Sequence, residues 1–210
     1  MVHPTPGFYR ESPMANQIEI CNSALIKIGA DVINALSDDT KGANLCKTSF
    51  SNCRKIVLRA HPWNCATKRV VLSPLVGAPA FDYAYRFQLP SDFVRFLTIN
   101  PDGDDDYRIE GTLLLADTDT IQLKYISDGV LDEELDDLCA EAVACYLAWH
   151  ISYAITQSNK VKTDMWESYI GALRMAKSAD AQEHPTVEFD VDVWLESRDT
   201  DQPGPLRSNR

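Results

Sequence analysis

The stretch that decides the fold is LDEELDDLCAEAVACYLAWHISYAITQSNKVKTDMWESYIGALRMAKSADAQ, residues 131–182. Apolar residues recur in it at spacings of three and four, which predicts one helix over 132–156 with the acidic residues 132–134 in its first turn. Its apolar face contains Leu135, Leu138, Ala142, Cys145 and Trp149. After a turn at Ser158 and Asn159, a second helix is predicted over 160–182. Because the link is short, we expect the two helices to be antiparallel.

The second helix has a polar stripe and an apolar face. The polar stripe comprises Asp164, Glu167, Ser168, Gly171, Arg174 and Ser178. The opposite face comprises Met165, Trp166, Tyr169, Ile170, Leu173 and Ala176. We expect this apolar face to be covered by other helices, because one helix cannot bury it alone.

Two more helices are predicted near the N-terminus, over 16–29 and 40–61. The first places Ile18, Cys21, Leu25 and Ile28 on one face and ends at Gly29. The buried face of the second comprises Ala43, Cys46, Phe50, Cys53, Val57 and Ala60. Its cationic residues Lys47, Arg54 and Lys55 are expected to face water. Pro62 ends it at about residue 61, and the segments 16–61 and 131–183 are expected to form one four-helix unit.

Residues 64–128 carry a strand pattern rich in Val, Ile, Tyr, Phe and Thr, interrupted by Pro, Gly and Asp. The candidate strands are 68–72, 83–89, 93–99, 107–115 and 120–127. We expect them to form one small antiparallel sheet, in which 107–127 is a hairpin closed by residues 116–119 and Gly111 is a bulge. Trp63 is expected to fill the corner between helix and sheet.

The predicted fold class is therefore α+β: an antiparallel four-helix unit with a small inserted antiparallel β-sheet and an extended C-terminal arm. Residues 1–14 are expected to be an extended arm or leader, 15–183 one domain, and 184–210 the C-terminal arm. In that arm apolar residues alternate with Glu188, Asp190 and Asp192, which is a strand pattern without a neighbouring partner strand. The candidate partner-contact residues are Val187, Phe189, Val191, Val193, Trp194 and Leu195. The alternative is that the arm completes the chain's own sheet.

Composition limits the possible functions. The formal net charge is −11 and the pI is about 4.7, which argues against tight binding of nucleic acid through its phosphates. The six cysteines contain no CxxC pair and are expected to be buried free thiols. No stretch of about 20 consecutive apolar residues is present, so no membrane span is expected.

No residue pattern predicts catalysis. His3, His61, His150 and His184 are scattered and none accompanies a nucleophile motif. The acidic run 102–106 lacks the spacing of a calcium-binding loop, and neighbouring carboxylates such as Asp132 and Glu133 would point in different directions on a helix. The sequence therefore predicts a protein that is not an enzyme and has no catalytic residue, metal or cofactor.

Three segments resemble a known family. They are IEICNSALIKIGADVINALSDD (residues 18–39), RKIVLRAHPWNCATKRVVLSP (54–74) and YAYRFQLPSDFVRFLTIN (83–100). Together with the two late helices they resemble the podovirus-type phage head-to-tail adaptors called tail tubular protein A, over roughly residues 15–183.

The resemblance implies a structural virion protein in the phage neck, made in the host cytoplasm. Such adaptors form a homo-oligomeric ring, here expected to be a dodecamer of 12 copies, that joins the portal protein to the tail nozzle (tail tubular protein B-like). The ring extends the DNA ejection channel, and DNA passes through its lumen without sequence-specific binding. The resemblance also implies that the C-terminal arm contacts the portal or a neighbouring copy. Two alternatives remain: a tail-associated glycan or peptidoglycan hydrolase, and a smaller head-completion factor.

Overall fold

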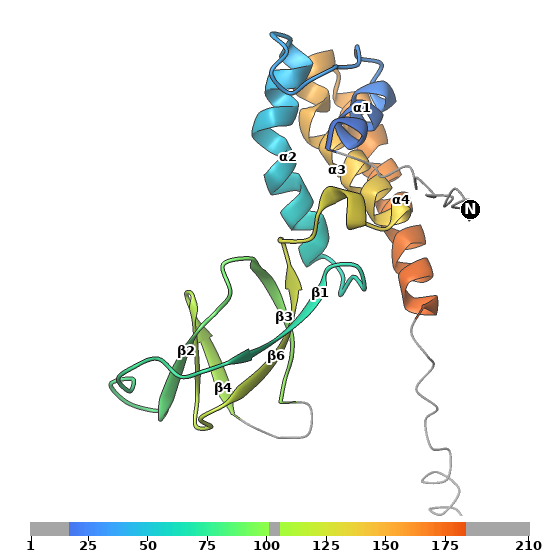
Figure 1. Cartoon of the computed structure of the whole chain (residues 1–210). Coiled ribbons are helices and arrows are strands. Elements are labelled where there is room, and N and C mark those ends of the chain that lie inside the picture. Colours follow the sequence, from blue (N-terminus) through green and yellow to red (C-terminus); the bar gives the residue numbers. More distant parts are fainter. Residues whose placement is uncertain (1–16, 101–105, 184–210) are drawn as a thin grey trace, which may run out of the picture.

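The computed structural model describes residues 17–100 and 106–183, which form an α+β fold with a helical part above a β part (Figure 1). The α-helices are α1 (Gln17–Lys27), α2 (Lys41–Arg59), α3 (Asp137–Thr156) and α4 (Asn159–Gln182), and a short 3₁₀ helix, η1, covers Asp132–Glu134. The strands are β1 (Thr67–Leu72), β2 (Tyr85–Gln88), β3 (Phe93–Ile99), β4 (Tyr107–Glu110), β5 (Leu113–Ala116) and β6 (Ile121–Ser127).

Helix α3 is the centre of the helical part, and it packs against α1, α2 and α4. It is buried on most sides because alanines such as Ala142, Ala144 and Ala148 let the neighbouring helices approach closely. By length and composition alone α3 could cross a membrane, which the sequence analysis did not anticipate. In this structure α3 is the central helix, and 56% of its most apolar stretch of 18 residues is buried inside the protein.

The helix boundaries follow their capping residues. Thr40 caps α2 by accepting a hydrogen bond from the Ala43 N–H at 3.1 Å. The helix predicted from residue 132 starts five residues later, because 132–134 form the 3₁₀ turn and Asp136 caps α3. Gln157, in the left-handed conformation with φ 53°, ends α3. Ser158 then caps α4 through the Val161 N–H.

The β part contains two three-stranded antiparallel sheets, so the prediction of one sheet is wrong. Their orders are β1-β6-β3 and β2-β5-β4. The predicted hairpin over 107–127 is also wrong, because β5 pairs with β4 and β2 whereas β6 pairs with β1 and β3. Gly111, with φ 61°, belongs to the turn between β4 and β5 and is not a bulge. The register irregularities lie in β3, between Phe93 and Arg95 and between Phe96 and Thr98.

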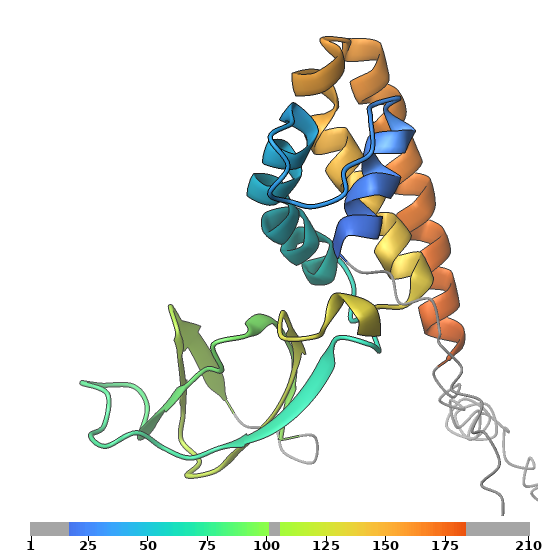
Figure 2. The ribbon, with the colours of Figure 1, turned by 45° about the horizontal axis from the view of Figure 1, so that its top comes forward.

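The two sheets of the β part lie opposite one another (Figure 2). They share a second hydrophobic core. It comprises Leu72, Phe87, Leu89, Ile99, Leu114, Ala116, Ile121, Leu123 and Tyr125. The main core belongs to the helices, and Ile126 at the end of β6 joins it. The chain crosses between the two parts twice, from α2 to β1 and from β6 through η1 to α3.

Candidate functional site

The candidate partner-contact residues of the C-terminal arm lie outside the described residues. This applies to Val187, Phe189, Val191, Val193, Trp194 and Leu195. Residues 1–14 and most of the acidic run, 101–105, also lie outside them.

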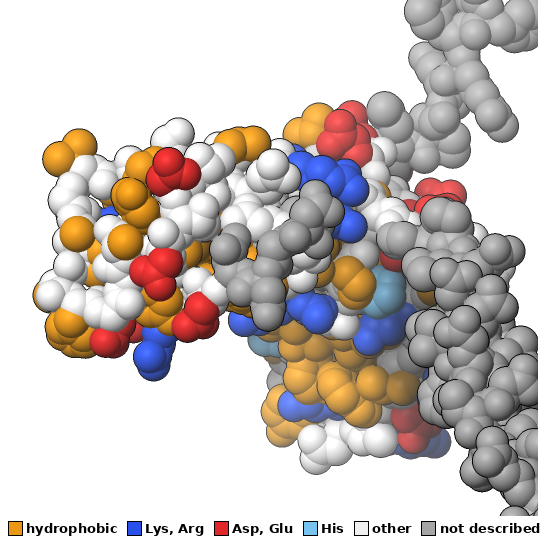
Figure 3. All heavy atoms as spheres, turned by 90° about the horizontal axis from the view of Figure 1, so that it is seen from below, with side chains coloured by type: hydrophobic (Ala, Val, Ile, Leu, Met, Phe, Trp, Pro, Cys, Tyr) orange, Lys and Arg blue, Asp and Glu red, His pale blue; other side chains and the backbone are white. Residues whose placement is uncertain are grey.

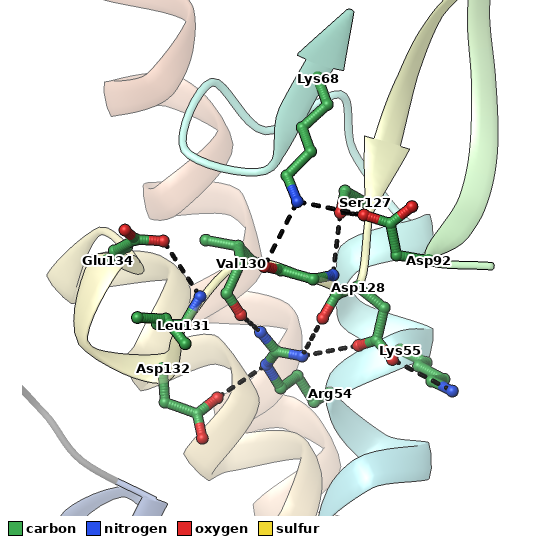
Figure 4. Close-up of polar contacts among 11 residues, drawn as sticks. Arg54, Lys55, Lys68, Asp92, Ser127, Asp128, Val130, Leu131, Asp132 and Glu134 are labelled. Carbon is green, nitrogen blue, oxygen red and sulfur yellow. Dashed lines mark hydrogen bonds and ion pairs between the residues drawn. The ribbon is translucent and has the colours of Figure 1, made fainter. Parts of the chain in front are cut away.

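The junction between the two parts is organised by Arg54 on α2 (Figure 4). Its Nη1 atom donates to the Asp128 carboxylate at 2.6 Å and to the Asp128 carbonyl at 3.0 Å, and its Nη2 atom donates to the Val130 carbonyl. The Nε atom lies 2.8 Å from Asp132 Oδ1, in ion-pair rather than hydrogen-bond geometry. A single cation thereby holds the segment that leads from β6 into η1 against α2.

The prediction that Arg54 faces water is wrong, since only 7% of the residue is exposed. It lies three residues before Val57 and four after Phe50, so the helical period places it on the border of the buried face. Burial of a guanidinium requires anionic partners, and Asp128 and Asp132 provide them. Lys55, which does face water, adds an ion pair to the second Asp128 oxygen at 3.1 Å.

The position of Asp132 at this junction changes the pKa of its carboxyl group. Burial raises the pKa of the Asp132 carboxyl above its ordinary value, although the Arg54 charge acts in the opposite direction. The half-buried carboxylate is held at the junction by its ion pair with Arg54.

A second polar network joins the three strands of the β1-β6-β3 sheet around Asp92 (Figure 4). Asp92 Oδ2 accepts from Ser127 Oγ at 2.6 Å and from Lys68 Nζ at 3.1 Å, and Oδ1 accepts from the Tyr125 hydroxyl at 3.0 Å. Burial raises the pKa of Asp92, but these hydrogen bonds outweigh it and leave the pKa below its ordinary value. Gly129 passes so close that an added Cβ would lie 2.8 Å from Asp92 Oδ2.

A third contact anchors the end of α4 to the corner between α2 and β1. Asp180 is buried, and its carboxylate accepts from the Asn64 N–H at 2.9 Å and lies 3.0 Å from His61 Nε2. Asn64 Nδ2 donates to the Asp180 carbonyl at 3.0 Å. Trp63 fills this corner as predicted; it is fully buried and its Nε1 donates to the Val57 carbonyl at 3.0 Å.

Among the described residues, large apolar side chains are exposed at several places, on the helices, on β1 and in the loops. On α4 they are Trp166, Ile170 and Met175. The loop between β1 and β2 exposes Val76 by 96% and Phe81 by 76%. Trp166 and Ile170 were predicted on the apolar face of their helix; their exposure means that the described helices do not cover all of that face. Figure 3 shows hydrophobic side chains on both parts of the surface, with Lys and Arg near their boundary.

The six cysteines are free thiols, five of them buried, as predicted. Hydrogen bonding with Cys139 lowers the pKa of the half-buried Cys65 thiol to about 7. Burial raises the pKa of Cys53 to about 12. Within residues 17–100 and 106–183, no group of three or more His, Cys, Asp or Glu residues could hold a metal ion.

No protein-family model matches this chain, and a comparison with curated proteins finds no significant match. The carboxylates of Asp92, Asp128, Asp132 and Asp180 each connect separate elements of the fold. The chemistry of this arrangement is that of cross-links, and those of Asp128 and Asp132 with Arg54 hold the segment after β6 against α2. Sequence reasoning missed the Arg54 junction, although a cation bordering an apolar helical face was the available signal.

Proposed function

We propose that this chain is a structural subunit of a tailed-phage neck, a head-to-tail adaptor that forms a ring between portal and tail nozzle. The observation that carries the proposal is a cross-linked two-part subunit with two separate exposed apolar surfaces. One is the α4 surface of Trp166 and Ile170, which lie one helical turn apart; the other is the loop surface of Val76 and Phe81. The resemblance of residues 15–183 to tail tubular protein A supplies the class of assembly.

Two different surfaces suit a ring for a geometric reason. In a closed ring of identical subunits, each copy meets its two neighbours through different patches, because the contact is heterologous. A subunit with a single exposed patch would favour a twofold dimer instead. A subunit in a ring must also keep its shape, and the ion pairs of Arg54 fix the β part to the helices.

The net charge and the C-terminal arm are also consistent with an adaptor ring. The net charge of −11, repeated around a ring, favours a lumen through which DNA passes without binding. The arm containing Val187, Phe189 and Trp194 is proposed to contact the portal or a neighbouring copy in the assembled neck. Twelve copies, as in the adaptors that the chain resembles, are proposed for the ring.

The test is a mass measurement of the purified chain with and without the portal protein of the same phage. We expect a monomer alone, since acidic copies repel each other at low salt, and a ring bound to portal when both are present. The double substitution Val76→Ser and Phe81→Ser should abolish the ring. The matched control is Ile26→Ser, which removes an exposed apolar side chain on α1. A chain that leaves the portal unbound under all salt conditions would refute the proposal.

A further inference from the structure

Strand β1 has an open edge. It lies at one side of the β1-β6-β3 sheet, and among the described residues no strand other than β6 pairs with it. Open edges present unpaired N–H and C=O groups and are the usual place where an additional strand joins a sheet. Figures 1 and 2 show this edge running away from the end of α4.

The register shows which backbone groups are available. The Ser127 N–H donates to the Ala66 carbonyl at 2.8 Å, which makes 66 and 127 a hydrogen-bonded pair. In an antiparallel ladder such pairs alternate, and the register is regular from Thr67 to Leu72. Lys68 and Val70 therefore direct their backbone groups towards β6. Arg69 and Val71 direct theirs away from the sheet.

The side chains of β1 also alternate. Val70 and Leu72 face the second core, whereas Arg69 and Val71 lie exposed on the other face. An open groove of about 620 Å³ lies across β1, β6 and β3 and is lined by Arg69, Val70, Val71, Thr98, Gln122, Leu123 and Lys124. Arg69 stands directly opposite Lys124 in the sheet. Like charges at that position destabilise the pair, so this face favours an acidic neighbour.

The C-terminal segment 187–196 has the complementary pattern. Glu188, Asp190 and Asp192 would project from one face of a strand, and Val187, Phe189, Val191, Val193 and Leu195 from the other. Placed beside β1, one face would set carboxylates next to Arg69. The other face would extend the apolar surface of Val70 and Leu72.

The chain is long enough to make this contact within one molecule. The bonds between Asp180 and Asn64 place the end of α4 beside the start of β1. From Asn64 to Arg69 is five residues, about 17 Å in extended chain. From Gln182 to Val187 is also five residues and has the same reach of about 17 Å.

We propose that in the free subunit residues 187–191 of the same chain add to the β1 edge beside residues 68–72, as a short fourth strand of the β1-β6-β3 sheet. The added strand ends before Leu75, because the Leu75 N–H already donates to the Arg86 carbonyl of β2 at 2.8 Å. This inference does not rest on the proposed function, because it concerns the isolated chain. If a portal protein takes the arm during assembly, it has to displace the arm from β1. While it is paired with β1, the arm cannot bind other proteins.

The experiment is amide hydrogen exchange, followed residue by residue by NMR, in the full chain and in a chain ending at residue 185. The amides of Arg69 and Val71 should exchange at least about tenfold more slowly in the full chain. The amides of Lys68 and Val70 bond to β6 and should be protected in both chains, so they serve as an internal control. Equal exchange of Arg69 and Val71 in the two chains would overturn the proposal.

Charge and concentration provide the remaining controls. Changing Glu188, Asp190 and Asp192 to Lys should remove the protection, whereas changing Glu196, Asp199 and Asp201 to Lys, an equal change of charge outside the contact, should keep it. Loss of protection in both triple variants would overturn the role of Arg69. Protection should be independent of protein concentration. Protection that rises with concentration together with a dimer mass would show that a second copy supplies the strand, and would overturn the proposal.

Discussion

The helical part and the β part of this protein are stabilised in different ways. The helical part surrounds α3, whose buried residues contact three other helices. The β part has a much smaller core between two three-stranded sheets, and small sheets of this kind depend on an apolar face that is covered. The β part is attached to the helices through the ion pairs of Arg54 with Asp128 and Asp132 and through Ile126, which joins the helical core. The stability of the β part should therefore depend on the junction, whereas that of the helices should not.

The largest expected effect separates the two cores. Phe50 is 3% exposed in the helical core and Phe87 is fully buried in the β core. Replacing either by Ala should lower the free energy of unfolding by about 3 to 5 kcal/mol. Phe50→Ala should destabilise the whole chain, whereas Phe87→Ala should first unfold the β part.

Hydrogen exchange of the two variants checks this contrast, with Phe50→Leu and Phe87→Leu as milder controls. If Phe87→Ala exposed the amides of α3 as readily as those of β5, the two parts would unfold as one unit and the contrast would be wrong.

The next effect concerns the junction. Arg54→Met leaves the half-buried carboxylates of Asp128 and Asp132 without their buried cation, and breaking a buried pair costs at most about 3 to 5 kcal/mol. Because the junction holds the β part, exchange should rise in β6 and β3 more than in α3. Adding Asp128→Asn and Asp132→Asn to Arg54→Met removes the unpaired charges and should recover part of the loss. If the triple variant were less stable than Arg54→Met, unpaired charge would not be the cause.

The contrast between the two parts also explains what the sequence could predict. Helix periodicity is local information, so α1, α2 and α4 were predicted to within two residues of their observed bounds, and Trp63 was placed correctly. Strand pairing depends on distant residues. The sequence predicts that β5 and β6 pair with each other, because they are adjacent along the chain. In the structure residues 117–120 instead form a corner between the two sheets.

The candidate site was predicted less well. Arg54 was assigned to solvent by its residue type, although its helical position bordered the buried face. Asp128 and Asp132, its partners, lie more than seventy residues away in sequence, and no local pattern connects them to α2. The arm residues Val187 to Leu195 lie outside the described residues, so their role as partner contacts stays a prediction.

A smaller effect should appear at acid pH. Asp92 has a pKa below its ordinary value in the folded chain, so its carboxylate favours folding above the unfolded pKa of about 4. That contribution is lost as the pH falls through the lowered folded pKa. In urea unfolding at several pH values, Asp92→Asn should therefore lose less stability on acidification than the unmodified chain does. Asp164→Asn, on the exposed side of α4, is the control and should leave the pH dependence unchanged. Identical profiles for Asp92→Asn and the unmodified chain would contradict the role of this network.

The smallest expected effect on stability is at the α4 surface. Trp166 is 41% exposed and lies 5.0 Å from Trp149, centroid to centroid. Trp166→Ser should cost only about 0.5 to 1.5 kcal/mol, the contribution of an aromatic pair, because much of the ring is already in water. Ring assembly on the portal should nevertheless fail. A variant that melts normally and still assembles would remove this surface from the proposed interface.

The central claim is that this chain forms the ring between portal and nozzle, and cryo-electron microscopy of the phage neck tests it most directly. The account predicts a ring of twelve densities directly beneath the portal, each divided into a helical part and a smaller β part joined at Arg54. It also predicts density from each C-terminal arm on the portal or on the adjacent copy. A neck in which the ring beneath the portal is built from a different chain would contradict the account.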